Sequence, residues 1–388
     1  LEQQLDLLAH HFWLSDDEDR KRRYLAAAAD AARASYANAA AIEYLERLIP
    51  LLEGVSRIER SIALAQVLHV IGEIPRAEAI VTEARALAEA AGDVGLVARC
   101  DHSLAESARR VGRFDEAAEL LERAGQGFAA VGDAAGEADV LQVTGTVAAQ
   151  RGDTSLARER YLESLEVRER FGDEAGVAAL TSNLGIVAQQ QGDSTAAREY
   201  ANRALQLYTK LGDRRRIGTC QVNLAWMDGL GGDHESARRR CEEAIRLAAE
   251  VGDRLNVGIA QNNLGDALRD LDRLDDAGRA YAAAVETYRE LNDLGPLMAM
   301  LEDVAILAVR RGDHREAFAL VGASDALRAA IGAPRSAGAE AALLGDLAPS
   351  RSALGDQAAD SARSEGARLE VQPAIELAIE AARGGSAS

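Results

Sequence analysis

The stretch that decides the fold is Asn183–Asp193, NLGIVAQQQGD, which closes on a Gly-Asp pair. Twenty residues further on the chain reads LGD again at 211–213, and Gly occupies every twentieth position from 72 to 252. Glycine adopts left-handed backbone freely and commonly lies just past the end of a helix. The spacing therefore predicts a series of helices whose C-terminal ends lie twenty residues apart.

The residues that replace glycine in this series fit the same interpretation. Asp272 and Asn292 stand at the next two positions, before Gly312 and Gly332 restore the glycine. Asn and Asp tolerate left-handed backbone better than most side chains, so we expect positive φ at all of these positions. An Asp follows most of the glycines and suits the N-cap of a following helix. These aspartates are Asp93, Asp133, Asp153, Asp173, Asp193, Asp213, Asp233, Asp253, Asp293 and Asp313. Each Gly-Asp pair is predicted to be a helix–turn–helix corner.

The composition agrees with a helical repeat protein. The chain has 388 residues, too many for one ordinary core, but in a solenoid each unit packs only on its neighbours. Aromatic residues make up 4% of the chain, and the dominant residues Ala, Leu, Glu and Arg favour helix. We expect almost no strand.

The charge and the sequence of the chain limit the partners and the location that we expect for it. A formal net charge of -19 opposes binding to a phosphate backbone, so no nucleic acid is expected to bind this segment. The sequence has no run of 18 apolar residues and no signal peptide, so we expect no membrane contact and a cytoplasmic location. Because Leu1, not Met, begins the chain in mid-pattern, we expect a piece of a larger protein.

Two kinds of helix alternate, so the true repeat is forty residues long. The first helices read TSNLGIVAQQQGD at 181–193, CQVNLAWMDGLGGD at 220–233 and AQNNLGDALRDLD at 260–272. Their partner helices each carry two small residues seven positions apart. These pairs are Ala197 and Ala204, Ala237 and Ala244, and Ala277 and Ala284. Small residues at this spacing let two antiparallel helices approach closely.

This pattern resembles the tetratricopeptide repeat (TPR), with Leu-Gly inside helix A, Gly near the turn and paired alanines in helix B. The usual unit has about 34 residues. The unit of forty residues is similar to an extended variant found in bacterial regulators. A HEAT or armadillo repeat fits the period but not the NLG and paired-alanine pattern. The resemblance implies an all-α fold, a right-handed α-solenoid of antiparallel helix pairs.

The repeats are predicted to cover 56–331. The segment 1–55 is expected to supply N-terminal helices that lead into the solenoid. After the repeats the register is lost, and Pro334, Pro349 and Pro373 are expected to interrupt the chain. Residues 332–388 are expected to form short capping helices and a frayed tail, because the apolar end of a solenoid needs cover.

Both flanks resemble the borders of the C-terminal TPR arm of large bacterial signalling proteins. The residues are LLAHHFWLSDDEDRKRRYLAAAADAARASYANAAAIEYLERL at 7–48, ALRAAIGAPRS at 326–336 and SARSEGARLEVQPAIELAIEAA at 361–382. Such proteins place an output domain (a nucleotide cyclase, a LuxR-type DNA-binding domain or a kinase) and a P-loop ATPase before this arm. The resemblance implies a sensor arm that binds a protein, a peptide, a small effector or its own ATPase domain. A free-standing TPR scaffold without an ATPase is the alternative.

No catalytic motif accompanies the repeat. A Walker A site needs Gly-Lys followed by Ser or Thr, but the only lysines, Lys21 and Lys210, follow Arg and Thr. The histidines lack paired metal-ligand spacing, and His234 and His314 fall in predicted turns. We expect no cofactor, no metal and no enzymatic activity in this segment.

One stripe of each A helix is expected to line the concave groove of the solenoid. Positions separated by 4, 3 and 4 residues share one side of a helix, and the count starts from the Asn of NLG. The candidate binding residues are Arg110, Gln150, Asn183, Gln190, Thr219, Asn223, Trp226, Asn263, Asp266 and Arg310. The same stripe includes Leu230, Asp270, Asp303 and Ile306.

Two interpretations stay open for the most distinctive stripe residues. Asn183, Asn223 and Asn263 recur every forty residues, and their amides suit either an extended peptide backbone or a bond to a neighbouring helix. Trp226 is either an aromatic anchor for a ligand or a core residue between helices. The oligomeric state is not predicted.

Overall fold

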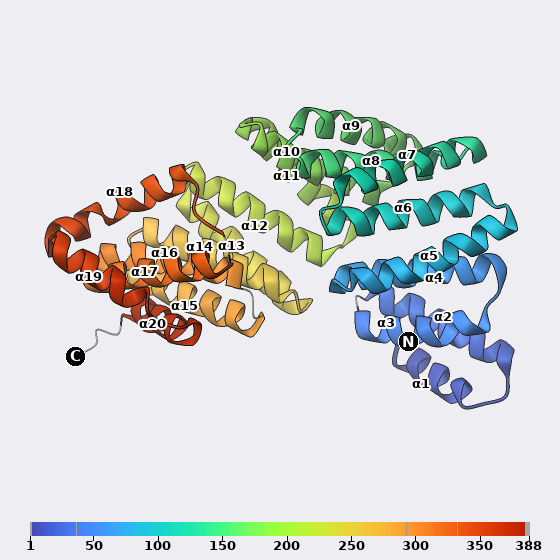
Figure 1. Ribbon diagram of the computed structural model, residues 1–388, viewed down its shortest axis with the longest axis horizontal. Helices are drawn as coiled ribbons and strands as arrows, with labels where there is room; N and C mark the ends of the chain where they lie inside the picture. The colour runs from blue at the N-terminus through green and yellow to red at the C-terminus, as the bar shows by residue number, and fades with distance from the viewer. Residues whose placement is uncertain (1, 36, 292–293, 332, 385–388) are drawn as a thin grey trace. The chain divides into compact units, whose positions relative to one another are not determined.

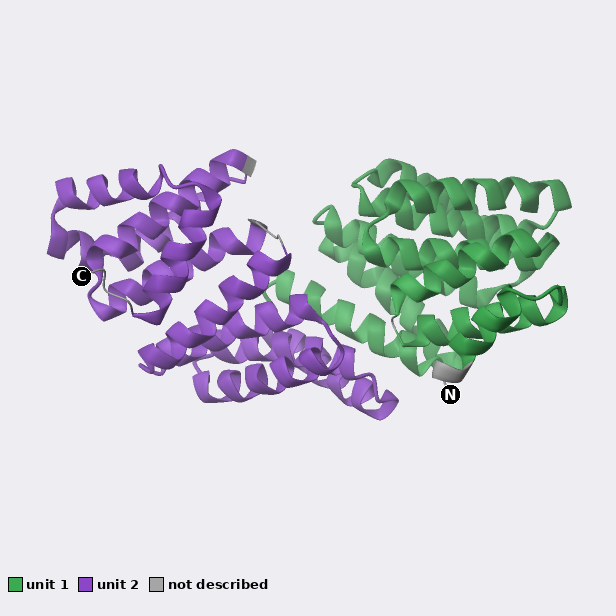
Figure 2. Cartoon of the chain, turned by 90° about the horizontal axis from the view of Figure 1, so that it is seen from below, with its two compact units in different colours: residues 1–192 green, residues 193–388 purple. Residues whose placement is uncertain are grey.

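The computed structural model describes residues 2–35, 37–291, 294–331 and 333–384. These residues form twenty α-helices and one short 3-10 turn, and none of them lies in a β-strand (Figure 1). The all-α solenoid of helix pairs predicted from the glycine spacing is confirmed. The chain divides into two compact units, unit 1 at 1–192 and unit 2 at 193–388 (Figure 2).

In unit 1, consecutive helices pack on one another, and from α4 onward they alternate between the A and B types. The A helices of successive repeats begin forty residues apart, at Val94, Ala134 and Glu174. The bounds are α1 (Glu2–Trp13), α2 (Glu18–Ala34), α3 (Asn38–Leu48), η1 (Ile49–Leu51), α4 (Gly54–Ile71), α5 (Ile74–Ala91), α6 (Val94–Arg110), α7 (Phe114–Val131), α8 (Ala134–Gln150), α9 (Thr154–Phe171) and α10 (Glu174–Gln190).

Unit 2 continues the alternation and ends in three helices that depart from it. The bounds are α11 (Ser194–Leu211), α12 (Arg214–Leu230), α13 (His234–Glu250), α14 (Arg254–Asp270), α15 (Leu274–Leu291), α16 (Leu294–Arg311), α17 (His314–Ile331), α18 (Ala337–Leu354), α19 (Asp356–Gly366) and α20 (Val371–Arg383). A large apolar core joins α14–α17 to these last three helices.

The predicted corner is built from two residues. Gly132 has φ 71°, and its N–H donates to the Ala129 carbonyl at 3.2 Å. The Asp133 N–H donates to the Phe128 carbonyl at 2.9 Å, and its own carboxylate accepts from the Gly136 N–H at 3.0 Å. Asp133 therefore closes α7 and caps α8 at once, so the two helices need no loop between them.

Positive φ is found wherever the structure describes the predicted glycine series. The glycines from Gly72 to Gly252 and Gly312 all have it, and Asp272, at φ 60°, is the one non-glycine described residue that does. Asn292, Asp293 and Gly332 lie outside the described residues. Of the predicted aspartates, those whose side chains are shown to cap a helix are Asp93, Asp133, Asp153, Asp173, Asp193, Asp213, Asp233 and Asp253.

The paired small residues of the B helices are buried, as their spacing predicts. Ala197 and Ala204 are both fully buried, and the corresponding alanines of α13 and α15 are at most 2% exposed. In α9 the second position is Ser164, whose hydroxyl donates to the Ala138 carbonyl of α8 at 2.7 Å. Small side chains thus bring each B helix against the backbone of its partner.

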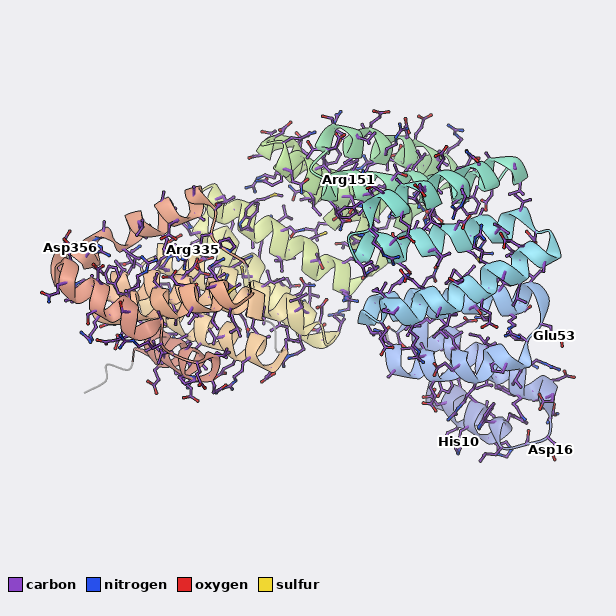
Figure 3. The ribbon with its side chains drawn as sticks, in the orientation of Figure 1. His10, Asp16, Glu53, Arg151, Arg335 and Asp356 are labelled. Carbon is purple, nitrogen blue, oxygen red and sulfur yellow. The ribbon has the colours of Figure 1, made fainter. Side chains whose placement is uncertain are left out.

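The closing helices dock through glycines and one buried cation. A Cβ atom on Gly322 of α17 would overlap the Arg363 carbonyl of α19, so these backbones touch directly. Arg335, labelled in Figure 3, is only 6% exposed in its side chain. It forms ion pairs with Glu302, Asp325 and Glu340. The loop before α18 is therefore fixed to α16 and α17.

Two local expectations were wrong. Pro349 does not interrupt the chain but lies inside α18, because Leu343, Leu347 and Ser350 are buried around it. The Ser350 hydroxyl also bonds His314 Nδ1 at 2.8 Å, which connects α18 to the start of α17. Pro373 also lies inside a helix, in the first turn of α20, where a backbone N–H would have no helical partner to lose.

His234 and His314 do not fall in turns. They are the first residues of α13 and α17, because the corner leaves no residue between the aspartate and the next helix.

None of the described helices combines the length and apolar character that a bilayer crossing requires.

Candidate functional site

The predicted stripe lies on an accessible side of the A helices. Its last position is exposed in every repeat from α6 to α16. These residues are Arg110, Gln150, Gln190, Leu230, Asp270 and Arg310. The two positions before it are more covered: both are partly buried in α14 and α16, the second is exposed in α10 and α12, and the first is buried in α6 and α8. This gradient is expected for a stripe that runs along the edge of the helix packing.

In unit 2 the stripes of three A helices surround one hollow of about 280 Å³. Trp226 and Leu230 come from α12, Asn263, Asp266 and Asp270 from α14, and Asp303 and Ile306 from α16. The B helix α13 adds His234 and Ala237. The structure therefore brings together three of the predicted site residues, Trp226, Asn263 and Asp266.

Apolar side chains form one wall of the hollow and remain open to water. The Trp226 side chain is 44% exposed and Leu230 is 67% exposed. A tryptophan that served only to fill the core would be covered by its neighbours. Trp226 instead keeps much of its surface exposed on the stripe and lines the hollow.

Charged side chains of α14 and α16 also line the hollow, and the buried Tyr281 holds two of them in place. The fully buried Tyr281 of α15 donates its hydroxyl to Asp266 Oδ1 at 2.7 Å and accepts from Arg269 Nη1 at 3.0 Å. Arg269 also lies 3.1 Å from Asp266 and donates through Nε to Asp270 at 3.0 Å. Burial raises the pKa of Asp266, although Arg269 and the Tyr281 hydroxyl act in the opposite direction.

Asp303 lines the hollow from α16. Its burial, together with the neighbouring Asp266 carboxylate, raises the pKa of Asp303 to about 8. Two carboxyl groups that share a confined space resist ionising together, so one of them retains a proton near neutral pH. Asp303 is therefore the group in the hollow whose charge is most easily changed by a ligand.

The other predicted residues lie elsewhere, and several are engaged within the fold. Arg110 donates to the His69 carbonyl at 3.3 Å, and Gln150 accepts from Arg109 at 3.2 Å. Thr219 accepts from Asn256 at 3.2 Å, and Arg310 bonds Asp272 at 3.1 Å. These bonds link neighbouring helices or close a corner, so these four side chains have structural partners.

The remaining two asparagines do not join the hollow. Asn183 belongs to α10 in unit 1, and Asn223 is a partly buried residue of α12 in unit 2. Gln190 is exposed at the end of α10. The two interpretations of the asparagines therefore stay open.

Sequence reasoning missed Arg269, Tyr281 and His234. Arg269 lies one position off the stripe and Tyr281 belongs to a B helix, so the A-helix count does not include them. A signal did exist: Gly265 faces the Tyr281 ring, and Gly145 faces Tyr161 in the same way 120 residues earlier. A glycine in helix A followed sixteen residues later by a tyrosine indicates this contact.

Sequence models described as tetratricopeptide repeat match residues 96–170, 176–250 and 258–293. The chain contains tetratricopeptide repeats. No curated protein sequence matches it.

Several solved structures are similar to the chain. A signal transduction ATPase with numerous domains (STAND) from Pyrococcus horikoshii, with a tetratricopeptide repeat sensor, has a TM-score of 0.65 and 14% identity over 91% of this chain. The chain covers 53% of that protein's length. A Rap protein complexed with Competence and Sporulation Factor has a TM-score of 0.55 and 13% identity, over 71% of this chain and 76% of that chain.

A third similar structure is the Rap conjugation gene regulator of the plasmid pLS20 in complex with the Phr* peptide. It has a TM-score of 0.52 and 14% identity, over 70% of this chain and 74% of that chain. At these identities the likeness shows the fold alone.

Proposed function

We propose that this chain is a non-catalytic, peptide- or protein-binding TPR arm that captures its ligand in the hollow beside Trp226. The observation that carries this proposal is an exposed aromatic side chain that lines one hollow together with polar groups of the accessible stripe. Binding sites commonly combine an apolar surface with a few fixed polar groups in this way. Interface hot spots are also enriched in tryptophan.

The similar structures support the proposal through what they bind. The Rap regulator of plasmid pLS20 is in complex with a peptide, and the other Rap protein is complexed with a factor. In the STAND protein the tetratricopeptide repeats are a sensor. By analogy of fold, a ligand in the groove would bias the arm between two states.

We further propose that the arm serves a larger bacterial, cytoplasmic regulator with an ATPase switch and an output domain. Residues 1–55 would lead from that switch into the forty-residue repeats at 56–331, and residues 332–388 would cap them. The partner would be a protein or peptide ligand or the ATPase domain itself. Reading the coding sequence upstream of Leu1 tests this part, because a start codon there would leave only the free-standing scaffold.

Selection of peptides from a displayed random library against the full chain tests ligand capture. We expect Trp226→Ala to weaken the selected peptides at least tenfold, at the scale of an interface hot spot. Helicity by circular dichroism should be unchanged, because Trp226 is 44% exposed. Leu344→Ala is the matched control, since Leu344 of α18 is also 44% exposed but lies outside the hollow. Peptides that bind the Trp226→Ala variant as tightly as the wild type would refute the hollow as the capture site.

A further inference from the structure

The hollow contains more negative than positive groups. Asp266, Asp270 and Asp303 line it, whereas Arg269 is the only arginine among its lining residues. That guanidinium is already bonded to Asp270 and to the Tyr281 hydroxyl. His234 Nδ1 lies 3.9 Å from Asp270. Within the described residues no ion pair involves Asp303, whose carboxyl group accepts a hydrogen bond from the Asn262 side chain. A carboxyl group has acceptor sites beyond that one, so it can also bind a ligand.

These carboxylates are not needed to build the repeat. In α8, three repeats earlier, the positions of Asp266, Arg269 and Asp270 are occupied by Thr146, Ala149 and Gln150. The same tyrosine contact forms there, because the Tyr161 hydroxyl donates to Thr146 Oγ1 at 3.0 Å. A neutral set of side chains therefore supports the same packing. The charges in α14 have no counterpart in that packing and need another explanation.

We propose that the hollow binds one cationic side chain of a peptide, arginine or lysine, between the Trp226 ring and the carboxyl groups of Asp303 and Asp266. This inference rests on the proposed function and specifies its ligand. The aromatic face attracts the cation and covers its aliphatic stem. The carboxyl groups accept its N–H bonds, and a guanidinium fits two oxygens at once.

The size and openness of the hollow suit a single side chain. Its volume of about 280 Å³ lies just below the usual range for small-molecule pockets, roughly 300–1,000 Å³. Its mouth leaves the Asp266 side chain 37% exposed, so a ligand can reach the carboxylate without moving a helix. A side chain carried by an extended peptide can enter while the peptide backbone stays on the stripe.

Binding of a cation changes the protonation of the hollow. The charged groups that face Asp303 are Asp266 and Arg269 of α14 and Glu302 of its own helix, and Tyr281 of α15 reaches Asp266. His234 of α13 lines the same space. A positive ligand favours the ionised carboxyl and lowers the pKa of Asp303 from its value of about 8. Capture of the cation therefore releases a proton at neutral pH.

Two blocked pentapeptides that differ only at the central residue test this inference. One carries arginine, Ac-Leu-Ala-Arg-Ala-Leu-NH2, and the other carries citrulline, which has the same shape but no charge. The chain has 2 tryptophans, so a Trp13→Phe background leaves Trp226 as the only fluorophore of its kind. We expect saturable quenching by the arginine peptide and binding of the citrulline peptide that is roughly tenfold weaker.

The carboxyl group is tested with Asp303→Asn, which keeps the shape and removes the ionisable oxygen. This variant should lose the preference for arginine over citrulline, whereas Asp346→Asn, at an exposed position on α18, should keep it. In the wild type, affinity for the arginine peptide should rise roughly tenfold between about pH 7 and about pH 9, because ionised Asp303 becomes the dominant form. The citrulline peptide and the Asp303→Asn variant should show no such rise.

The outcomes separate this inference from the proposed function. Equal binding of the two peptides to the wild type overturns the cationic pocket but leaves peptide capture intact. Absence of saturable binding by the arginine peptide up to millimolar concentration overturns the cationic pocket as well. The library selection with the Trp226 variant then decides the proposed function independently.

Discussion

The helix pairs α8–α9 and α14–α15 share one packing contact, a glycine against a tyrosine ring, and differ in the side chain that accepts the hydrogen bond from that tyrosine. In each pair a glycine of the A helix, Gly145 or Gly265, lies against the ring of a buried tyrosine of the B helix. In each pair that tyrosine donates its hydroxyl to the residue after the glycine, at 3.0 Å to Thr146 and at 2.7 Å to Asp266. The packing of each helix pair is thus set by the glycine and the tyrosine, whereas the residue that accepts from the tyrosine hydroxyl can vary.

The difference lies in what each acceptor leaves unsatisfied. Thr146 accepts from Tyr161 and donates to the Gln142 carbonyl at 3.0 Å, so its hydroxyl is fully used. Asp266 keeps a charge that Arg269 only partly balances, with Asp303 close by. A repeat protein can therefore acquire a charged site by changing stripe residues while its packing residues stay the same.

The largest loss of stability should come from adding a methyl group at Gly145 or Gly265, the glycine of each helix pair. We expect Gly265→Ala to lower the free energy of unfolding by about 2 kcal/mol, because the new methyl group overlaps the fully buried Tyr281 ring. Gly145→Ala should cost about 1 kcal/mol, since its Cβ would lie 2.8 Å from Tyr161, slightly farther away. Urea unfolding measures both changes.

Gly345→Ala is the control for that pair. Gly345 lies inside α18 with nothing within 4 Å of an added Cβ, so alanine should stabilise the helix slightly. A similar loss of stability in all three variants would show that ring overlap is not the cause.

Removing the tyrosine hydroxyls should distinguish the two acceptors. Tyr281→Phe removes one donor from the partly exposed Asp266 carboxylate, and we expect a loss of about 2 kcal/mol because hydrogen bonds to charged groups are the stronger ones. Tyr161→Phe leaves only a neutral hydroxyl without that donor, and about 1 kcal/mol is expected. Thermal melting of both variants at neutral pH measures the contrast. Equal losses would mean that the charge of Asp266 contributes nothing to the bond.

The pH dependence of stability should follow the α14–α16 carboxyl groups. Asp303 holds its proton to about pH 8 in the folded chain, whereas an unfolded Asp ionises near pH 4. Between these values the folded state binds more protons, so stability should fall as pH rises through this window, by at most about 1.4 kcal/mol per pH unit.

Asp303→Asn should flatten that dependence and be the more stable form at the upper end of the window. Urea midpoints measured across this pH range test both statements. A wild-type midpoint that rises with pH over the same range would contradict the raised pKa of Asp303.

The smallest effect on stability should come from replacing Asp266 of α14 by threonine, the residue at the equivalent position of α8. Asp266→Thr keeps a hydrogen-bond acceptor for Tyr281, so the free energy of unfolding should change by less than about 0.5 kcal/mol. The ratio of arginine-peptide to citrulline-peptide affinity should nevertheless fall towards one. Loss of stability with an unchanged ratio would reverse the comparison and make Asp266 a packing residue.

The sequence predicted best those features that depend on one residue type in one backbone conformation. The corners follow from glycine and aspartate alone, and even Asp272 has the positive φ expected of it. The accessible stripe follows from helical periodicity. Which stripe residues meet in a hollow depends on how neighbouring helices are aligned, and that alignment is set by tertiary contacts such as Gly265 on Tyr281.

The misses have a common physical origin. Pro349 is tolerated inside α18 because buried residues on both sides hold the helix together, which a local rule does not see. Arg269 and Tyr281 take part in the hollow through hydrogen bonds between α14 and α15. Such bonds cannot be predicted from the spacing of residues within one helix.

The two-residue corner also limits how such a chain can change length. Asp133 bonds both the helix before it and the helix after it, so the corner has no unbonded residue that could rearrange around an insertion. One extra residue inside a helix would swing everything beyond it by about 100° around that helix axis. Lineages of this protein should therefore gain or lose whole forty-residue modules, and single-residue insertions should be confined to the segment before α18, where the repeat has already ended.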